Sequence, residues 1–126
     1  MTRFNGRRGL VVVNARLFGP SGDVIARLAV DTGASSTLVN EELLILIGYD
    51  PAALPKTVRF TTGSGVETAP RITIDRIETL GQVRARFSAI AHTLPSSAAI
   101  DGVLGLDFLR SHVVTIDFRN GEISLA

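Results

Sequence analysis

The chain has 126 residues, a formal net charge of +1, no cysteine, 45% hydrophobic residues and 20% charged residues. This length suits one domain, and the composition is that of an ordinary globular protein. The small net charge argues against binding to nucleic acid or to an anionic membrane, and the lack of cysteine excludes disulfides, thiolate nucleophiles and zinc–sulfur sites.

The N-terminal segment, residues 1–9, is basic and is interpreted as a linker to a single domain over residues 10–126. The longest aliphatic run, residues 43–47, is far shorter than the ~20 residues that a membrane-spanning helix needs. No charged-then-apolar signal peptide opens the chain. We therefore expect a cytoplasmic protein, or the soluble domain of a membrane-anchored precursor, with no membrane contact within this chain. The preference for arginine over lysine favours a bacterial source.

Short stretches rich in valine and isoleucine alternate with turn residues along most of the chain, a pattern typical of β-structure. The last two expected strands are joined by Asn120-Gly121, a strong tight-turn dipeptide. The strands expected from this pattern cover residues 10–18, 24–30, 57–61, 66–79, 82–91, 113–118 and 122–125.

Two helices are also predicted. The first begins after Asn40, a capping residue followed by two glutamates at the positive end of the helix dipole, and it ends at Gly48. The body of this helix has no polar face, so we expect it to be packed on more than one side. The second helix is short, over residues 106–111.

A weak internal repeat relates the two halves of the chain. Residues 22–28 match residues 81–87 at four of seven positions, and each copy belongs to a hairpin followed by a glycine-containing loop and a helix. Chance similarity between two β-hairpins is one explanation, and a domain built from two related halves is the other. Only the first half contains Asp-Thr-Gly.

The stretch Ala-Val-Asp-Thr-Gly-Ala-Ser-Ser, residues 29–36, places a carboxylate at the end of an apolar strand. An ionised carboxylate that leaves water is unfavourable unless it is paired, hydrogen-bonded or protonated. Gly33 permits a tight turn that brings its N–H towards Asp31, and Thr32 is stiff with a hydroxyl that both donates and accepts. Taken alone, the triplet favours a structural turn. If two copies of the loop met, however, their carboxylates would share one proton and work as acid and base.

The context of this loop is more specific. An apolar strand leads into it, a glycine-rich turn follows at residues 62–65, and Asp-Gly-Val-Leu-Gly-Leu-Asp-Phe-Leu-Arg follows at residues 101–110. With these motifs the sequence resembles the retropepsin-like aspartic proteases, especially the Gly-Leu-Asp branch found in bacteria and in DNA-damage-inducible ubiquitin-shuttle proteins. The likeness extends from Leu10 to Leu125.

The resemblance implies an all-β fold, a closed retropepsin-like β-barrel with one or two short helices that is active as a homodimer. It implies that Asp31 is the catalytic aspartate, that the hydroxyl of Thr32 bridges the subunits, and that the N–H of Gly33 donates to the carboxylate. Asp107 is interpreted as a helix cap and buried network residue. The substrate-binding residues that the resemblance implies, including the tip of a flap, are Ala34, Ser35, Thr62, Gly63, Ser64, Gly65 and Val103.

The sequence departs from the family pattern at three positions. Viral members carry an Asp–Arg ion pair at the positions of Ser35 and Leu106, so dimer strength and substrate registration must depend here on other contacts. Pepsin-like enzymes carry serine in place of Ala34, and the missing hydroxyl removes a donor to the charged carboxylate. We therefore expect activity at mildly acidic to near-neutral pH.

These features predict a homodimeric aspartic endopeptidase that hydrolyses a peptide or protein substrate without a metal or cofactor. The alternative is a retropepsin-fold dimer that binds peptides or proteins with little or no cleavage. The strand at 122–125 and residues near Leu10 are expected to build the dimer sheet. A Gly-Ser-Gly phosphate loop is disfavoured because no lysine or helix start follows it, and His92 and His112 lack partners at metal-ligand spacing.

Overall fold

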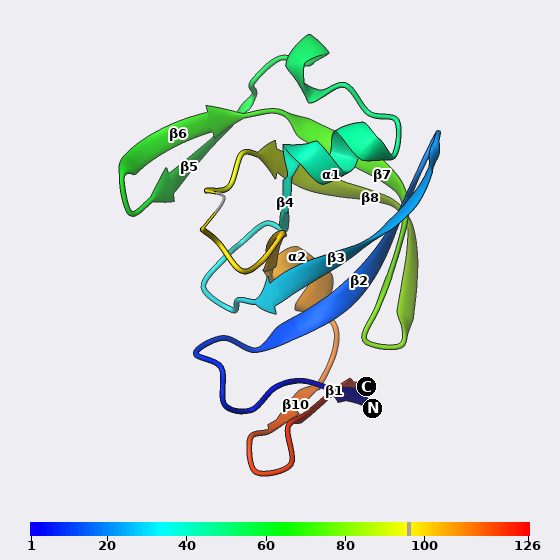
Figure 1. Cartoon of the computed structure of the whole chain (residues 1–126), viewed down its shortest axis with the longest axis vertical. Helices are drawn as coiled ribbons and strands as arrows, with labels where there is room; N and C mark the ends of the chain where they lie inside the picture. The colour runs from blue at the N-terminus through cyan, green and yellow to red at the C-terminus, as the bar shows by residue number, and fades with distance from the viewer. Residues whose placement is uncertain (96) are drawn as a thin grey trace.

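The computed structural model describes residues 1–95 and 97–126 of the chain, and the fold is mostly β (Figure 1). The helical segments are α1 (Glu41–Leu46), the 3-10 turn η1 (Pro51–Ala53) and α2 (Leu106–Leu109). The strands are β1 (Thr2–Arg3), β2 (Val12–Gly19), β3 (Gly22–Val30), β4 (Leu38–Asn40), β5 (Val58–Thr62), β6 (Gly65–Ala69), β7 (Arg71–Thr79), β8 (Gln82–His92), β9 (Gly102–Leu104), β10 (Val114–Asp117) and β11 (Glu122–Leu125).

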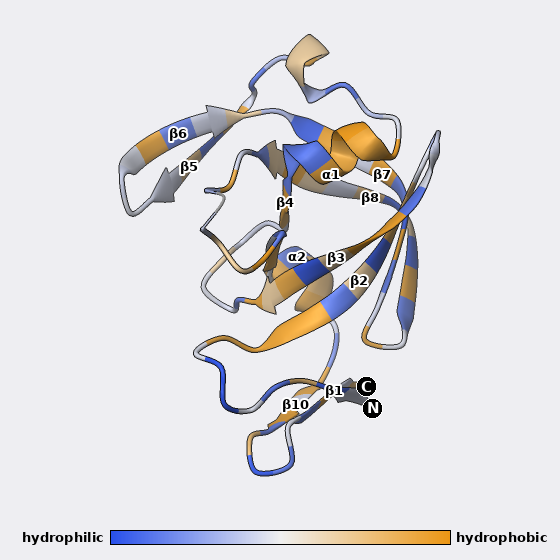
Figure 2. Cartoon of the chain, in the orientation of Figure 1, coloured by the Kyte–Doolittle hydropathy of each residue, from blue (hydrophilic) through white to orange (hydrophobic). Residues whose placement is uncertain are grey.

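Six strands close into a barrel in the order β2-β3-β9-β4-β8-β7. Side chains alternate between inside and outside along these strands, and the hydropathy bands on β7 and β8 in Figure 2 follow the same alternation. The inward side chains form one core, to which β2, β3, β7 and β8 contribute most of the residues. Its largest fully buried members are Phe108, Leu17, Leu28, Leu44, Ile47, Ile74, Ile77, Leu104 and Ile123.

The two halves of the barrel follow the same order of elements, which supports the internal repeat. In the first half the β2–β3 hairpin is followed by a loop, β4 and α1; in the second, the β7–β8 hairpin is followed by a loop, β9 and α2. Each half also completes the other, since β3 pairs in parallel with β9 and β8 pairs in parallel with β4. The short strands β4 and β9 pair with one another, antiparallel.

Gly102 lies where β4 and β9 pass closest. A β-carbon at this position would lie 2.0 Å from the carbonyl oxygen of Leu38, so only glycine fits between the two strands. The lack of a side chain at Gly102 therefore lets strands of the two halves pack closely.

The predicted strand over residues 66–79 is in fact two strands. Pro70 separates β6 from β7, because proline has no N–H to donate to a ladder. Among the described residues, β6 pairs only with β5 in a two-stranded hairpin, while β7 enters the barrel. The hairpin therefore extends away from the barrel wall, at the left of Figure 1.

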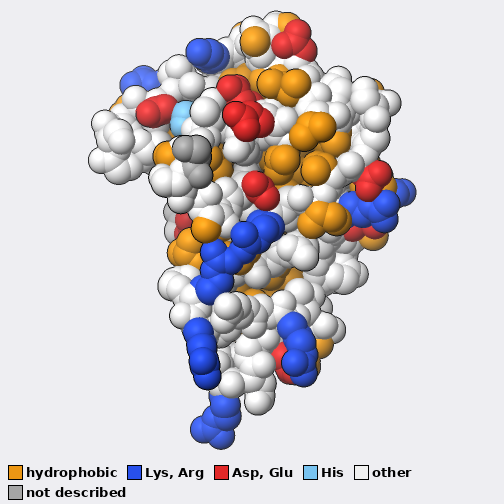
Figure 3. All heavy atoms as spheres, in the orientation of Figure 1, with side chains coloured by type: hydrophobic (Ala, Val, Ile, Leu, Met, Phe, Trp, Pro, Cys, Tyr) orange, Lys and Arg blue, Asp and Glu red, His pale blue; other side chains and the backbone are white. Residues whose placement is uncertain are grey.

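The first helix begins as predicted, since the side chain of Asn40 accepts a hydrogen bond from the N–H of Glu42. The expectation that α1 is packed on more than one side is wrong. Leu44 is fully buried, but Ile45 and Leu46 are 56% and 69% exposed, and hydrophobic side chains gather on the surface over this helix in Figure 3.

A three-stranded antiparallel sheet, in the order β1-β11-β10, lies below the barrel in Figure 1. Thr2 pairs with Ile123, so the N-terminal segment expected as a linker is attached to the domain through β1. The last strand, expected at the edge of a dimer sheet, has a neighbour on both sides within its own chain. The edges of this sheet are β1 and β10 instead.

Candidate active site

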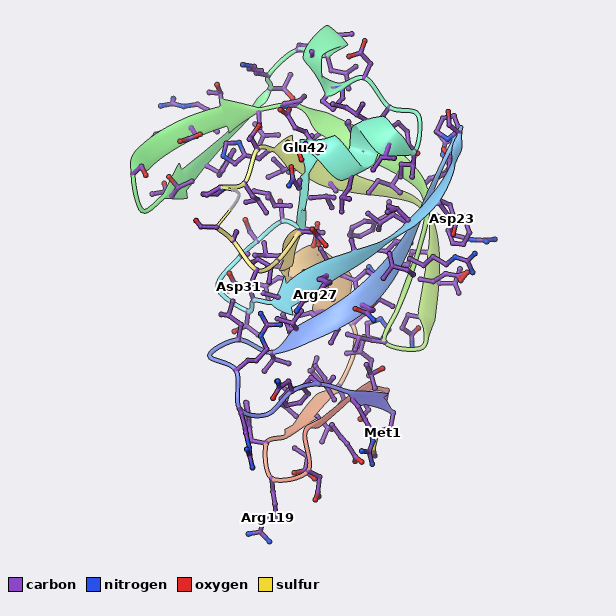
Figure 4. All side chains as sticks on the ribbon, viewed as in Figure 1. Met1, Asp23, Arg27, Asp31, Glu42 and Arg119 are labelled. Carbon is purple, nitrogen blue, oxygen red and sulfur yellow. The ribbon has the colours of Figure 1, made fainter. Side chains whose placement is uncertain are left out.

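Asp31 follows directly after β3, and its backbone is fixed on both sides (Figure 4). Its N–H donates to the carbonyl oxygen of Leu104 at 3.0 Å, and its own carbonyl oxygen accepts the N–H of Ala34 at 3.2 Å. The N–H of Gly33 donates to Oδ1 of the Asp31 carboxylate at 2.8 Å. This half-buried carboxylate is therefore oriented by the turn that follows it, as the sequence predicted for Gly33.

Residues 104–107 support the Asp31 loop from behind. The N–H of Leu106 donates to the carbonyl oxygen of Ala34 at 2.8 Å. A β-carbon at Gly105 would lie 2.8 Å from that oxygen and 2.7 Å from the backbone carbon of Ser36. Glycine at this position lets the two segments approach backbone to backbone, and Leu106 thereby contacts the loop without the ion pair of the viral enzymes.

Thr37 and Asp107 form the second support. The carboxylate of Asp107 accepts the N–H of Thr37 at 2.9 Å and its hydroxyl at 2.7 Å, and the Thr37 hydroxyl accepts the N–H of Gly105 at 3.1 Å. Thr37 is completely buried. Asp107 is thus the network residue that the sequence predicted, but it is not a helix cap. The N-cap position of α2 is Gly105, with no side-chain cap bond, because the carboxylate faces Thr37 instead.

A cleft of ≈ 770 Å³ opens beside Asp31. Its walls come from the loop after β3, the start of β4, the β5–β6 hairpin, the end of β8 with the loop that follows, and β9. Among the described residues, the lining consists of Asp31, Gly33, Ala34, Ser35, Ser36, Leu38, Arg59, Phe60, Thr61, Thr62, Ser64, Glu67, Ile90, His92, Thr93, Leu94, Pro95 and Val103.

Most of the residues predicted for the site line this cleft: Asp31, Gly33, Ala34, Ser35, Thr62, Ser64 and Val103. Three others, Thr32, Gly63 and Gly65, are exposed and lie outside the lining. At the hairpin tip, the hydroxyl of Thr62 accepts the N–H of Ser64 at 3.2 Å and donates to the carbonyl oxygen of Gly65 at 3.3 Å. Gly65 has a φ of 121°, a backbone conformation that favours glycine.

Two contacts that the sequence alone did not reveal join the hairpin to the barrel. Oε2 of Glu67, on β6, lies 3.3 Å from Nε2 of His92, at the end of β8. Phe60, which is the cross-strand partner of Glu67, packs edge-on against the His92 ring with centroids 5.0 Å apart. Period-2 alternation from buried Ala69 places Glu67 on the inward face of β6, and this is the signal that could have found it.

In the described part of the chain, no helix is long and apolar enough to cross a membrane. The described residues also contain no group of three or more histidine, cysteine, aspartate or glutamate side chains placed to hold a metal ion. His112 does have a partner, although not a metal ligand: its Nε2 lies 3.0 Å from Nη2 of Arg84.

Comparison with solved structures shows the same fold in two other proteins. A retropepsin-like aspartic protease from Rickettsia conorii is 24% identical, with a TM-score of 0.69, and the match covers 99% of this chain and 95% of that one. The retroviral protease-like domain of Ddi1 from Leishmania major is 20% identical, with a TM-score of 0.63, and the match covers 94% of this chain and 90% of that one. No curated protein matches the sequence.

A family model described as "gag-polyprotein putative aspartyl protease" matches residues 22–111, which is more than half of the chain. This range runs from the start of β3 to just beyond α2, and so includes the Asp31 loop, the β5–β6 hairpin and the support from residues 104–107. The chain therefore belongs to the family of retropepsin-like aspartic proteases.

Proposed function

We propose that the protein is an aspartic endopeptidase whose catalytic site contains Asp31 from each of two identical protomers. The observation that carries the proposal is the position of Asp31. Its carboxylate faces a cleft of ≈ 770 Å³, with Oδ1 held by the N–H of Gly33 and the backbone anchored to Leu104. Of the two acidic residues in the described lining, Glu67 is already paired with His92, which leaves Asp31 for chemistry.

The proposed reaction uses both carboxylates of the dyad. Two carboxyl groups within hydrogen-bonding distance share one proton, because both cannot ionise at low cost. The ionised member accepts a proton from water, whose oxygen bonds to the scissile carbonyl carbon, while the protonated member donates to the carbonyl oxygen. As the tetrahedral intermediate collapses and its C–N bond breaks, one of its hydroxyl groups returns a proton to the ionised carboxylate and the protonated carboxyl gives its proton to the leaving amine. The dyad then again holds one shared proton.

The substrate in this proposal is a peptide in extended conformation. The β5–β6 hairpin, acting as a flap, and the strand ends beside Asp31 offer backbone groups for pairing with an added strand. The apolar lining residues suit hydrophobic side chains of the substrate; they are Leu38, Phe60, Ile90, Leu94 and Val103.

The dimer in this proposal is built on the exposed face of the Asp31 loop. Thr32 is exposed in the single chain and is therefore available to a second protomer. The outer edges of the three-stranded sheet, β1 and β10, offer unpaired backbone groups for further contacts.

The first test is digestion of a peptide library by the wild type and by Asp31→Asn, with the products identified by mass spectrometry. We expect Asp31→Asn to lose cleavage by about 10²- to 10⁴-fold, the range for removal of a general acid–base group. Asp50→Asn, which changes an exposed carboxylate outside the described lining, is the matched control and should cleave like the wild type. Unreduced cleavage by Asp31→Asn would refute the proposal.

A mixing experiment tests the shared site directly. When Asp31→Asn is added in increasing amounts to a fixed amount of wild type and the subunits exchange, mixed dimers carry one carboxylate only. Activity should then fall as the inactive subunit is added, whereas independent monomers would keep constant activity. Sedimentation of the same samples reports the dimer.

The alternative function is peptide or protein binding with little or no cleavage. The observation that favours it is the pair Ser35 and Leu106, which stand where viral members carry an ion pair. Neither side chain is charged, and the bond between the two segments runs here from the N–H of Leu106 to the carbonyl oxygen of Ala34. A wild-type dimer that retains library peptides but releases no products would establish this alternative.

A further inference from the structure

Arg84 of β8 holds the C-terminal end of α2. Its Nη1 donates to the carbonyl oxygen of Asp107 at 2.9 Å, and its Nη2 donates to that of Phe108 at 2.5 Å. The guanidinium also stacks on the Phe108 ring, with Cζ 4.3 Å from the centroid. The last carbonyl groups of a helix have no partner within the helix, so Arg84 supplies donors that α2 itself lacks.

His112 fixes the other side of the same guanidinium. Nη2 of Arg84 lies 3.0 Å from Nε2 of His112. A guanidinium only donates hydrogen bonds, so Nε2 must be the acceptor and the ring proton must be on Nδ1. Arg84 is therefore held by two backbone carbonyls, one aromatic face and one imidazole nitrogen.

The N-terminal end of α2 holds the Asp31 loop. Leu106 donates its N–H to Ala34, and the carboxylate of Asp107 holds both the N–H and the hydroxyl of Thr37. Asp107 thus belongs to both contacts, since its carboxylate binds the loop and its carbonyl oxygen accepts from Arg84. A four-residue helix has little stability of its own, so its position depends on such tertiary contacts.

We propose that Arg84 is a positioning residue for Asp31, and that it acts through α2. Arg84 is outside the described lining of the cleft, so it does not contact substrate there. If the guanidinium no longer holds α2, then Asp107 and Leu106 shift, and the loop from Asp31 to Thr37 shifts with them. This inference rests on the proposed protease function, because its main effect is on the geometry of the dyad.

The central variant is Arg84→Lys, which keeps the charge but cannot reach two carbonyls and an imidazole with a planar fork. We expect kcat to fall about 10- to 100-fold while KM stays within about twofold, since misplacement of a catalytic group by about 1 Å costs roughly 10² in rate. Arg86→Lys, at an exposed position on the same strand, should leave both constants unchanged.

An effect of Arg84→Lys on the stability of the fold must be separated from an effect on the position of Asp31. Ile47→Val, in the core beside the β2–β3 turn, should lower the stability of the fold without changing a residue that pairs with Arg84. At a temperature where both variants are folded, Ile47→Val should keep the wild-type kcat and Arg84→Lys should not. Equal kcat in both variants would overturn the proposal.

His112 provides a second, milder test. His112→Gln retains a side-chain acceptor for Arg84 and should keep most of the wild-type kcat, whereas His112→Leu removes the acceptor and should lower it. The two His112 variants test the same role of Arg84 if Arg84→Lys does not fold. Equal rates for His112→Gln and His112→Leu would count against the role of Arg84.

Two measurements need no activity, so they separate failure of this inference from failure of the proposed function. The ¹⁵N shifts of the His112 ring should show the Nδ1–H tautomer in the wild type. Hydrogen exchange of the Gly33 and Gly105 amides should be faster in Arg84→Lys than in Arg86→Lys. If the wild type cleaves no peptide but shows the Nδ1–H tautomer, and Arg84→Lys shows the faster amide exchange, only the protease function is refuted. If the Gly33 and Gly105 amides exchange equally fast in Arg84→Lys and Arg86→Lys, the link from Arg84 to the Asp31 loop is refuted.

Discussion

The side chains of His92 and Glu67 join the β5–β6 hairpin to the barrel wall, with Nε2 and Oε2 3.3 Å apart. Within the described part of the chain, the hairpin pairs with no other strand, because β6 and β7 separate at Pro70. Apart from its covalent ends, the hairpin contacts the barrel through this pair and through the packing of Phe60 on the His92 ring.

The first prediction concerns this contact. Glu67→Gln removes the negative charge from the pair and so weakens the contact between the hairpin and the barrel. The backbone amides of the hairpin should then show faster hydrogen exchange, and KM for a cleaved peptide should rise. Stability should change by less than about 1 kcal/mol, because both side chains are partly exposed. The matched control is Glu78→Gln, which removes the partner of Arg76 on β7, outside the cleft lining. Equal exchange of the β5–β6 amides in both variants would contradict the prediction.

The second prediction concerns the buried hydroxyl behind the Asp31 loop. Thr37→Val keeps the shape of the side chain but leaves the N–H of Gly105 without its acceptor and Asp107 with one donor fewer. We expect a loss of about 1–3 kcal/mol in the free energy of unfolding, as for other buried groups left unpaired. Denaturant unfolding measures the loss, and Thr73→Val, at an exposed position of β7, should stay within about 0.5 kcal/mol of the wild type.

The third prediction compares two glycines of the site. Gly105→Ala places a β-carbon within 2.7–2.9 Å of the backbone of Ser36 and Ala34, so the Asp31 loop must move away from residues 104–107. We expect destabilisation of about 1–3 kcal/mol or more, together with loss of cleavage. Gly63→Ala enters open space at the hairpin tip and should fold as well as the wild type. Equal melting temperatures for Gly105→Ala and Gly63→Ala would show that Gly105 does not lie close to the backbone of Ala34 and Ser36.

The fourth prediction concerns pH and the β10–β11 turn. The N–H and the side-chain amide of Asn120 donate to the carboxylate of Asp117 and lower its pKa below the usual 3.8. When the pKa is lower in the folded state than in the unfolded state, the ionised carboxylate stabilises the fold at every pH above the unfolded-state pKa. This stabilisation is lost as the pH falls through the folded-state pKa.

We therefore expect Asp117→Ala to be less stable than the wild type at neutral pH, with the difference shrinking below pH 3.8. Urea unfolding at a series of pH values measures the trend. Asp50→Ala is the control, since the Asp50 side chain makes no cap bond at η1. A difference between Asp117→Ala and the wild type that is constant over the whole pH range would refute the assignment.

The strands and helix starts that the sequence predicts correctly depend on local chemistry. Alternating side chains mark β2, β3, β7 and β8, and Asn40 marks the start of α1 because its side chain accepts a backbone N–H within the same turn. The Asp31 loop is also local, since Gly33 donates to a carboxylate only two residues away. Such features can be predicted from the order of a few neighbouring residues.

The features that the sequence did not predict depend on partners far along the chain. Strands β4 and β9 have three residues each, too few to show a period, and each exists because it pairs with strands of the other half. Glu67 and His92 meet only after the hairpin has folded towards the end of β8. Nothing near Arg84 in the sequence indicates that its side chain donates to the carbonyl groups of α2.

The pairing of Thr2 with Ile123 brings the two ends of the chain to the same side of one small sheet (Figure 1). A short peptide linker could therefore close the backbone into a ring without crossing the barrel. In the chain-entropy model, closing a loop of this size would raise the free energy of unfolding by about 4–5 kcal/mol, because the unfolded chain would have fewer conformations. New ends could then be opened at the exposed turn between β2 and β3, giving a circularly permuted protein in which the three-stranded sheet lies within the sequence.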